Sequence, residues 1–194
     1  MKAPELWILR HGETTWNAEE RMQGHLDSPL TQTGVEQAGN QREILRSISL
    51  PDGPRFIVSH SGRALATADV VAQDSSWNFV IDKRLMEVCL GDYQGKTLSE
   101  IKQSEGLDLQ SDRHLWKFSG PGCESLADMT ARVQSFLDDL KGPSVIITHG
   151  ITSRVLRCLV LGIDVTKLAS LPGGQGVVHH ISRGRARVLR LDHT

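Results

Sequence analysis

The sequence predicts an α/β fold, a three-layer sandwich in which helices flank both faces of a mostly parallel central sheet. Apolar runs of strand length recur along the chain and alternate with segments whose apolar residues have helical spacing. Strands that alternate with helices need crossover connections, which favour parallel pairing. The central runs are apolar at every position, as expected for strands covered on both faces. A chain of 194 residues without repeats is expected to form one domain over residues 1–194.

Six apolar runs are predicted to form the strands: LWIL at 6–9, FIV at 56–58, FVI at 79–81, VII at 145–147, VVHHI at 177–181 and RVLRL at 187–191. SRGRA at 182–186 is typical of a hairpin turn, because its glycine accepts a positive φ. His179 and His180 are neighbours on one strand, so they should point to opposite faces and cannot bind one metal ion together.

Three segments have the apolar spacing of amphipathic helices. They are 31–48, which begins with the capping residue type Thr31, then 124–140, and 150–161 with Gly162 as its stop signal. The segment 91–123 is rich in glycine, serine and charge and has weak helical signals. We expect it to cross over a site rather than to form a second domain.

Composition excludes several classes of protein. The net charge is −1, which argues against a broad surface for nucleic acid or membrane. The three cysteines, Cys89, Cys123 and Cys158, form no CxxC pair, which argues against a disulfide framework or a zinc site and favours a reducing cytosol. No apolar run is long enough for a membrane helix or a signal peptide. We therefore expect a cytoplasmic protein with neither nucleic acid nor membrane as partner.

Three of the predicted strands end in the same kind of residues. Arg or His stands beside Gly at each end, in Arg10-His11-Gly12, His60-Ser61-Gly62-Arg63 and His149-Gly150. Carboxyl ends of parallel strands meet at one edge of a sheet, where helices also begin. Singly, each such side chain is more often a solvated or hydrogen-bonded loop residue. Together they favour one anion site, because guanidinium groups and helix N-termini suit phosphate or carboxylate.

Glu87 has two interpretations. Glutamates are common on surfaces, and a surface carboxylate is the simpler one. An anion site that does chemistry also needs a proton donor for the leaving group, and a carboxyl with a raised pKa serves this purpose. Burial beside Leu85, Met86 and Val88 would supply that raised pKa.

Other chemistries have weaker signals. GPGCE at 120–124 lacks the Lys-Ser/Thr of a phosphate-binding P-loop. Ser61 lacks the G-x-S-x-G elbow of a serine hydrolase. No cluster of histidines and carboxylates has metal-ligand spacing. Because arginines and histidines supply the positive charge that a metal supplies elsewhere, we expect a metal-independent site without cofactor.

Several motifs together resemble the histidine phosphatase superfamily, also known as the phosphoglycerate mutase-like family. They are LRHGETTWN, RMQGHLDSPLTQTG, S-x-x-GRA-x-x-TA at 59–68, L-x-E followed by GDYQG, PGCES and THG, which occur in the family's order from residue 6 to about residue 162. The resemblance implies that His11 is the nucleophile and becomes a transient phosphohistidine. It implies that Arg10 and Arg63 hold the phosphoryl oxygens and that His149 adds a hydrogen bond and charge.

The resemblance also assigns the remaining site residues. Glu87 would donate a proton to the leaving oxygen and then activate the second acceptor. The substrate-binding positions would be Asn17, which contacts the phosphoryl group, and Gln23 and Gly24 in the substrate-contact loop. The chain departs from the family pattern near the mouth of the site, at Ser59-His60-Ser61, Tyr93-Gln94 and Gln175. These departures concern substrate identity, and the roles of His60 and Gln175 stay open.

Three activities are compatible with these motifs: a small-molecule phosphomonoesterase, a phosphoglycerate mutase-type phosphotransferase, and a non-catalytic domain that binds a phosphorylated ligand. The presence of all the chemical residues disfavours the last. The segment between Glu87 and Gly122 is short compared with that of the mutases, and a short cover excludes water poorly. We therefore expect a phosphatase that acts on a phosphorylated small molecule, as a monomer or a homodimer.

Overall fold

The computed structural model describes residues 4–105 and 114–191. Within these ranges six strands form one sheet in the order β3-β2-β4-β1-β5-β6. The strands are β1 (Leu6–Arg10), β2 (Arg55–Val58), β3 (Phe79–Ile81), β4 (Ser144–Thr148), β5 (Val178–Ser182) and β6 (Arg185–Leu189). β1, β2, β3 and β4 pair in parallel, whereas β5 and β6 are antiparallel to their neighbours. The prediction of a mostly parallel sheet is confirmed.

Three of the helices lie at bounds close to the three predicted segments. The helices are α1 (Thr15–Ala18), α2 (Gln32–Ser47), α3 (Gly62–Ala72), α4 (Leu98–Glu105), α5 (Leu126–Asp138) and α6 (Gly150–Leu161), with 3-10 turns η1 (Lys83–Leu85), η2 (Gly91–Tyr93), η3 (Leu115–Phe118) and η4 (Val165–Ser170). The hydroxyl of Thr31 accepts the Gly34 amide and caps α2, and Ser125 caps α5 in the same way. The sequence analysis did not predict α3, which supplies Arg63.

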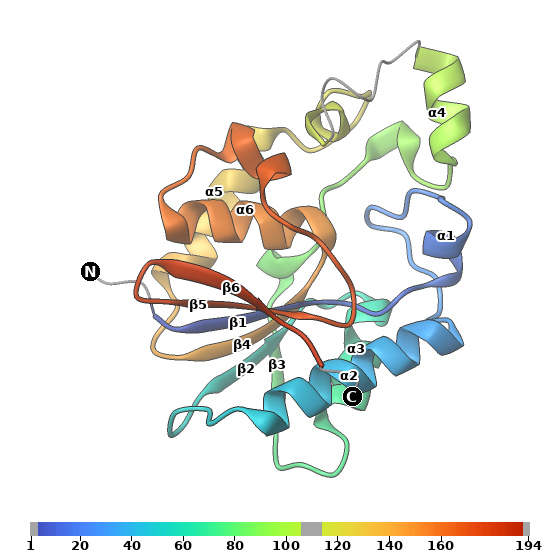
Figure 1. Ribbon diagram of the computed structural model, residues 1–194. Helices are drawn as coiled ribbons and strands as arrows, with labels where there is room; N and C mark the ends of the chain where they lie inside the picture. Colours follow the sequence, from blue (N-terminus) through green and yellow to red (C-terminus); the bar gives the residue numbers. More distant parts are fainter. Residues whose placement is uncertain (1–3, 106–113, 192–194) are drawn as a thin grey trace.

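Helices α5 and α6 lie on one face of the sheet and α2 and α3 on the other (Figure 1), and alternation along the strands divides the apolar core between these two faces. Leu6 and Ile8 pack with α5 and α6, whereas Trp7 and Leu9 pack with α2 and α3. Successive side chains of a strand point to opposite faces, so β1 contributes to both cores. The three-layer arrangement predicted from the sequence is confirmed.

The strand β3 differs from the prediction that every central run is covered on both faces. Val80 is 58% exposed and Ile81 is 53% exposed. β3 lies at one end of the strand order and pairs with β2 on one side. Its apolar residues therefore reflect strand propensity at an edge rather than burial in the core.

The carboxyl ends of β1, β2 and β4 lie at one edge of the sheet. The ladder continues beyond the strands, because the His11 amide donates to the Thr148 carbonyl and the Ser59 amide to the Ile147 carbonyl, both at 3.0 Å. Gly12 lies backbone to backbone against Gly34 at the start of α2, and a Cβ on either residue would overlap the other segment. The first residues after β1 are therefore held against both the sheet and α2.

The described parts of the segment 91–123 contact the loop that follows α1. The amide of Met22 donates to the Lys96 carbonyl and the amide of Gly95 donates to the Met22 carbonyl, both at 2.8 Å. Ile101 and Trp116 extend into the core on the α5 and α6 face. Residues 106–113 of this segment lie outside the described ranges. Among the described residues, no helix combines the length and the apolar character needed to cross a membrane.

Candidate active site

His11 lies directly after β1, and its ring is buried. Its Nδ1 lies 2.7 Å from the carbonyl oxygen of Gly12, which only accepts hydrogen bonds, so Nδ1 carries the proton. Burial holds the pKa of His11 well below its usual value, and the nearby His149, Arg10 and Arg63 lower it further. The imidazole is therefore neutral, with an unprotonated Nε2 that can act as a nucleophile.

His149 is the N-cap residue of α6, although its side chain makes no capping hydrogen bond. It lies beside His11, with a distance of 5.2 Å between the two ring centroids. Its Nε2 contacts the hydroxyl of Ser59 at 2.8 Å and that of Ser61 at 3.3 Å. Its Nδ1 is buried and has no hydrogen-bond partner among the described residues. Burial, with Arg63 and Arg10 nearby, lowers the pKa of His149 well below its usual value, so the expectation that His149 adds a positive charge is wrong for the free protein. The ring is thus fixed at one nitrogen and available to a ligand at the other.

Arg10 and Arg63 each have N–H donors that no described residue accepts. In both side chains Nε is buried without a partner in the described parts of the chain. Arg63 binds the carbonyls of Leu26 and Gly24 at 2.7 Å and 2.9 Å and the carboxylate of Asp27 at 2.9 Å. These bonds use both hydrogens of Nη1 and one of Nη2, which leaves the Nε–H and one Nη2–H for an anion.

Asn17 is oriented by hydrogen bonds to its carbonyl oxygen. Its Oδ1 accepts from the backbone amide of Thr14 at 3.3 Å and from Nε2 of Gln175 at 3.2 Å. Gln175 also donates to the carbonyl of His11 at 3.1 Å. Because both donors bind Oδ1, these contacts leave the Nδ2 donors of Asn17 unused. Gln175, whose role the sequence left open, is therefore bonded both to Asn17 and to the backbone of His11.

Gln23 and Gly24 support the loop between α1 and α2. The Gln23 amide donates to the Thr14 hydroxyl at 2.8 Å and accepts from the Ser28 hydroxyl at 3.2 Å. Gly24 has a φ of +53° and offers its carbonyl to Arg63. Their side-chain and carbonyl groups therefore hold the loop and Arg63 in place. Direct contact with a substrate stays a prediction for both residues.

Glu87 lies against the N-terminus of α6. Its carboxylate accepts the amides of Ile151 and Thr152 and the hydroxyl of Thr152, each at 3.1 Å. Burial raises the pKa of Glu87, but the Ile151 bond, the charge of Lys117 and further amides outweigh burial, so the pKa is lowered. The expectation of a raised pKa is therefore wrong for the free protein. Sequence reasoning counted the apolar neighbours and missed the helix amides.

Several residues that position the site were not singled out as site residues in the sequence. The hydroxyl of Thr67 accepts the amide of Gly12 at 3.0 Å and fixes the turn after His11. Three further side chains each bond one site residue: Asp27 bonds Arg63, Ser59 bonds His149, and Thr152 bonds Glu87. Asp27 and Ser59 lie within quoted motifs, and Thr152 lies in the first turn of a predicted helix, so position in a motif or a helix was the available signal.

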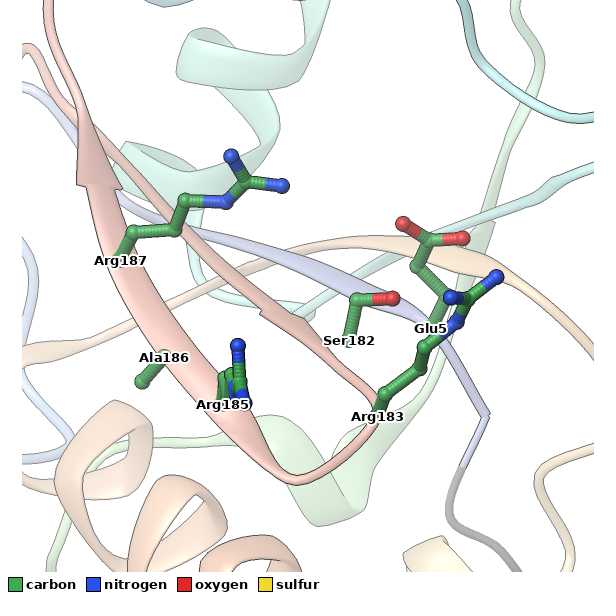
Figure 2. A pocket seen from close by; sticks show the side chains of 6 residues that line it. All are labelled: Glu5, Ser182, Arg183, Arg185, Ala186 and Arg187. Atoms are coloured by element: carbon green, nitrogen blue, oxygen red, sulfur yellow. The ribbon is translucent and has the colours of Figure 1, made fainter.

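A basic hollow of about 820 Å³ lies elsewhere, beside the β5–β6 hairpin. Figure 2 shows Arg183, Arg185 and Arg187 along this hairpin, with Glu5 facing them. Glu5 precedes β1, so the hollow lies at the amino end of that strand, whereas His11 lies at the carboxyl end. No residue that the sequence predicted for the site lines it. Within 4–105 and 114–191, no three or more His, Cys, Asp or Glu side chains are grouped to hold a metal ion.

Comparison with known proteins identifies the family of the chain. The model of the histidine phosphatase superfamily (branch 1) matches residues 6–192. A protein named probable phosphoglycerate mutase GpmB from Salmonella choleraesuis (strain SC-B67) is 33% identical over 165 residues, which cover 82% of this chain and 75% of the relative.

Two solved structures have similar folds. A mycobacterial glucosyl-3-phosphoglycerate phosphatase superposes with a TM-score of 0.81 at 29% identity, over 98% of this chain and 100% of the other. The α-ribazole phosphatase of Shigella flexneri has a TM-score of 0.81 at 26% identity, over 96% of each chain. The family model spans almost all of the chain and includes every predicted site residue. On these grounds the chain belongs to branch 1 of the histidine phosphatase superfamily.

Proposed function

We propose that the protein is a phosphomonoesterase that hydrolyses phosphorylated small molecules through a phosphohistidine at His11. One observation carries the proposal. Buried nitrogens of Arg10, Arg63 and His149 have no partner among the described residues, and all three residues lie around the neutral ring of His11. Buried polar groups are nearly always satisfied, so unpartnered donors around a nucleophile favour a site built for an anion.

In the first step, Nε2 of His11 attacks phosphorus as the bond from phosphorus to the leaving oxygen breaks. Arg10, Arg63 and the Nδ2 donors of Asn17 balance the charge on the three equatorial oxygens. Glu87 gives its proton to the leaving oxygen. Because the pKa of Glu87 is lowered in the free protein, the carboxylate must take up this proton when the negatively charged substrate binds beside it.

In the second step, water attacks the phosphohistidine. Glu87, now ionised, accepts a proton from the water as the phosphorus–nitrogen bond breaks. Inorganic phosphate leaves, and His11 returns to its neutral form. The low pKa of Glu87 in the free protein keeps the carboxylate ionised and able to accept this proton. The α6 amides that stabilise the ionised form also lower its affinity for the proton, which favours proton donation in the first step once Glu87 is protonated.

The second candidate is a phosphoglycerate mutase-type phosphotransferase, in which a substrate hydroxyl rather than water accepts the phosphoryl group. The name of the Salmonella relative is the observation that favours it. The two activities differ in product. We expect inorganic phosphate to appear at the rate at which substrate disappears. Formation of an isomeric phosphate ester without release of phosphate would support the mutase.

The test of the proposed function is a screen of phosphate release over a panel of phosphorylated metabolites together with p-nitrophenyl phosphate. We expect turnover of several members by the unmodified protein and none by His11→Ala. Folding of the variant is checked by circular dichroism. The absence of phosphate release from every member would contradict the proposal.

A reducing cytoplasm is the compartment that we propose, and the three free cysteines support it.

A further inference from the structure

Two cations beside the site have no task in the mechanism above. Lys117 belongs to η3, and its Nζ lies 5.5 Å from the ring centroid of Trp116. Arg154 lies one turn into α6, where its Nη1 donates to the Gly150 carbonyl at 3.0 Å. Both side chains are partly buried. Placing two cations at the cover of a site costs solvation free energy, so their position calls for an explanation.

The charged groups of the site form two sets, one at the His11 end and one at the Glu87 end. His149 and Arg63 act on His11, whereas Lys117 acts on Glu87. Arg10 joins the ends, because its Nε and Oε2 of Glu87 would both lie 3.6 Å from a Cβ on Gly150. Glu87 marks the position of the leaving oxygen. Cations grouped with Glu87 therefore lie where the leaving alcohol has to be accommodated.

Burial lowers the pKa of both cations, and Arg154 also has a donor that no described residue accepts. Nε of Arg154 is buried with no partner in the described ranges, and Gly173 packs against its Nη2, where a Cβ would overlap it. Burial, together with Arg10 and Arg154, lowers the pKa of Lys117 to about 8 against the opposing effect of Glu87. The nearby carboxylate is already engaged by the α6 amides. An additional anion would satisfy both cations.

We propose that Lys117 and Arg154 form a second anion subsite, which binds a carboxylate or a second phosphate on the leaving alcohol of the substrate. The proposal rests on the proposed function, because the role of Glu87 defines the leaving-group end. It narrows the substrate class to phosphomonoesters that carry another acidic group. Phosphomonoesters of neutral alcohols fill only the His11 end of the site.

A binding experiment that needs no turnover tests the subsite. Propylphosphonate and 3-phosphonopropionate have the same length and differ by a methyl group against a carboxylate, and neither is hydrolysed. Ethane-1,2-diphosphonate places a second phosphonate at the same position. Titration calorimetry is expected to show that the protein binds the two doubly acidic ligands about tenfold or more tightly than propylphosphonate. Preference for one of the two identifies the acidic group.

Variants locate the preference. Lys117→Gln and Arg154→Gln are each expected to remove most of it and to leave the affinity for propylphosphonate within about twofold. Lys117→Arg keeps the charge and should restore the preference. Lys167→Gln, an exposed lysine on η4, is the matched control and should change neither affinity. Should Arg154→Gln fail to fold, the two Lys117 variants still decide the matter.

The outcomes separate this proposal from the proposed function. Equal affinity for propylphosphonate and 3-phosphonopropionate overturns the subsite even when phosphate release from p-nitrophenyl phosphate is normal. A carboxylate preference that Lys117→Gln and Arg154→Gln leave intact overturns it as well. Loss of all phosphate release with the binding preference retained would instead contradict the phosphatase and leave the anion subsite standing.

Discussion

Nε2 of Gln175 donates to the backbone carbonyl of His11 at 3.1 Å, so a loop residue ahead of β5 is bonded to the backbone of the nucleophile. The same nitrogen donates to Oδ1 of Asn17 at 3.2 Å. One amide group therefore connects two residues that we place on the phosphoryl group. This relationship gives Gln175 a positioning role.

Gln175→Ala is expected to lower kcat/KM by roughly tenfold, because hydrogen bonds of about 1 kcal/mol each no longer orient Asn17 and the turn after β1. Steady-state kinetics measure the loss, and the thermal midpoint is expected to change little. Gln32→Ala, a substitution of the same kind on the exposed face of α2, serves as control and should be neutral. Identical kinetics for the two variants would remove Gln175 from the site.

The identity of the nucleophile can be read from the phosphoenzyme. Rapid denaturation after mixing with labelled substrate should trap phosphate on the protein in a form that is stable to base and labile to acid. His11→Ala should abolish the label, whereas His149→Ala should slow its formation without moving it, because we assign His149 a hydrogen bond to the phosphoryl group and not the nucleophilic attack. Label found on His149 or on Ser61 would reverse the assignment.

Glu87→Gln is expected to slow release of an alkyl leaving group by roughly two to four powers of ten, because the proton donor is lost. A p-nitrophenolate leaving group needs less protonation and should be affected less. Comparison of the two substrates separates this role from the contacts of Glu87 with the α6 amides, whose loss would affect both equally. Equal losses return Glu87 to a purely structural role.

The low pKa of His11 predicts how its ring titrates. A folded-state pKa below the ordinary value keeps the imidazole neutral at pH 6.5 and above, and protonation is delayed to lower pH. Nitrogen-detected NMR of the free protein should show a proton on Nδ1, none on Nε2, and no titration between pH 8 and about 6.5. A midpoint near 6.5, or a proton on Nε2, contradicts the geometry described for the nucleophile.

Phosphatase activity is expected to survive prolonged chelation with EDTA, because Arg10 and Arg63 provide positive charge, and His149 a hydrogen bond, for the phosphoryl oxygens. The rate is measured before and after dialysis against the chelator. A loss of turnover that is restored by a divalent ion would show that these side chains are not sufficient.

The layers of the fold and the edge of the sheet that holds the site could be predicted from the sequence. Their signal, an apolar strand that ends in polar residues, is contained in residues that are neighbours in the chain. The helix at 150–161 and the placement of His11 and His149 followed in this way. α3 was not predicted. Its buried residues are largely small, with Ala64 and Ala68 among them, and Ser61 makes no side-chain cap, so both local helix signals are weak.

The ionisation of Glu87 could not be predicted from its neighbours in the chain. Leu85, Met86 and Val88 indicate an apolar setting, which alone would raise its pKa. The amides that lower it belong to Ile151 and Thr152, which are brought to Glu87 by the packing of α6. Gln175 was unassigned for the same reason, since its partners lie near the other end of the chain. Tertiary contacts of this kind leave no local pattern.

The continuation of the sheet ladder past β1 and β2 sets the timescale on which the site can open. The amides of His11 and Ser59 are bonded to β4 carbonyls, so these amides exchange with solvent only when the central strands separate. Neither the nucleophile nor the serine that holds His149 belongs to a segment that unfolds independently. The loop around Gly24, which we predict to contact the substrate, is instead held by hydrogen bonds from Arg63 to the carbonyls of Leu26 and Gly24. Local fluctuations can therefore admit substrate and release phosphate while the reactive centre persists until global unfolding.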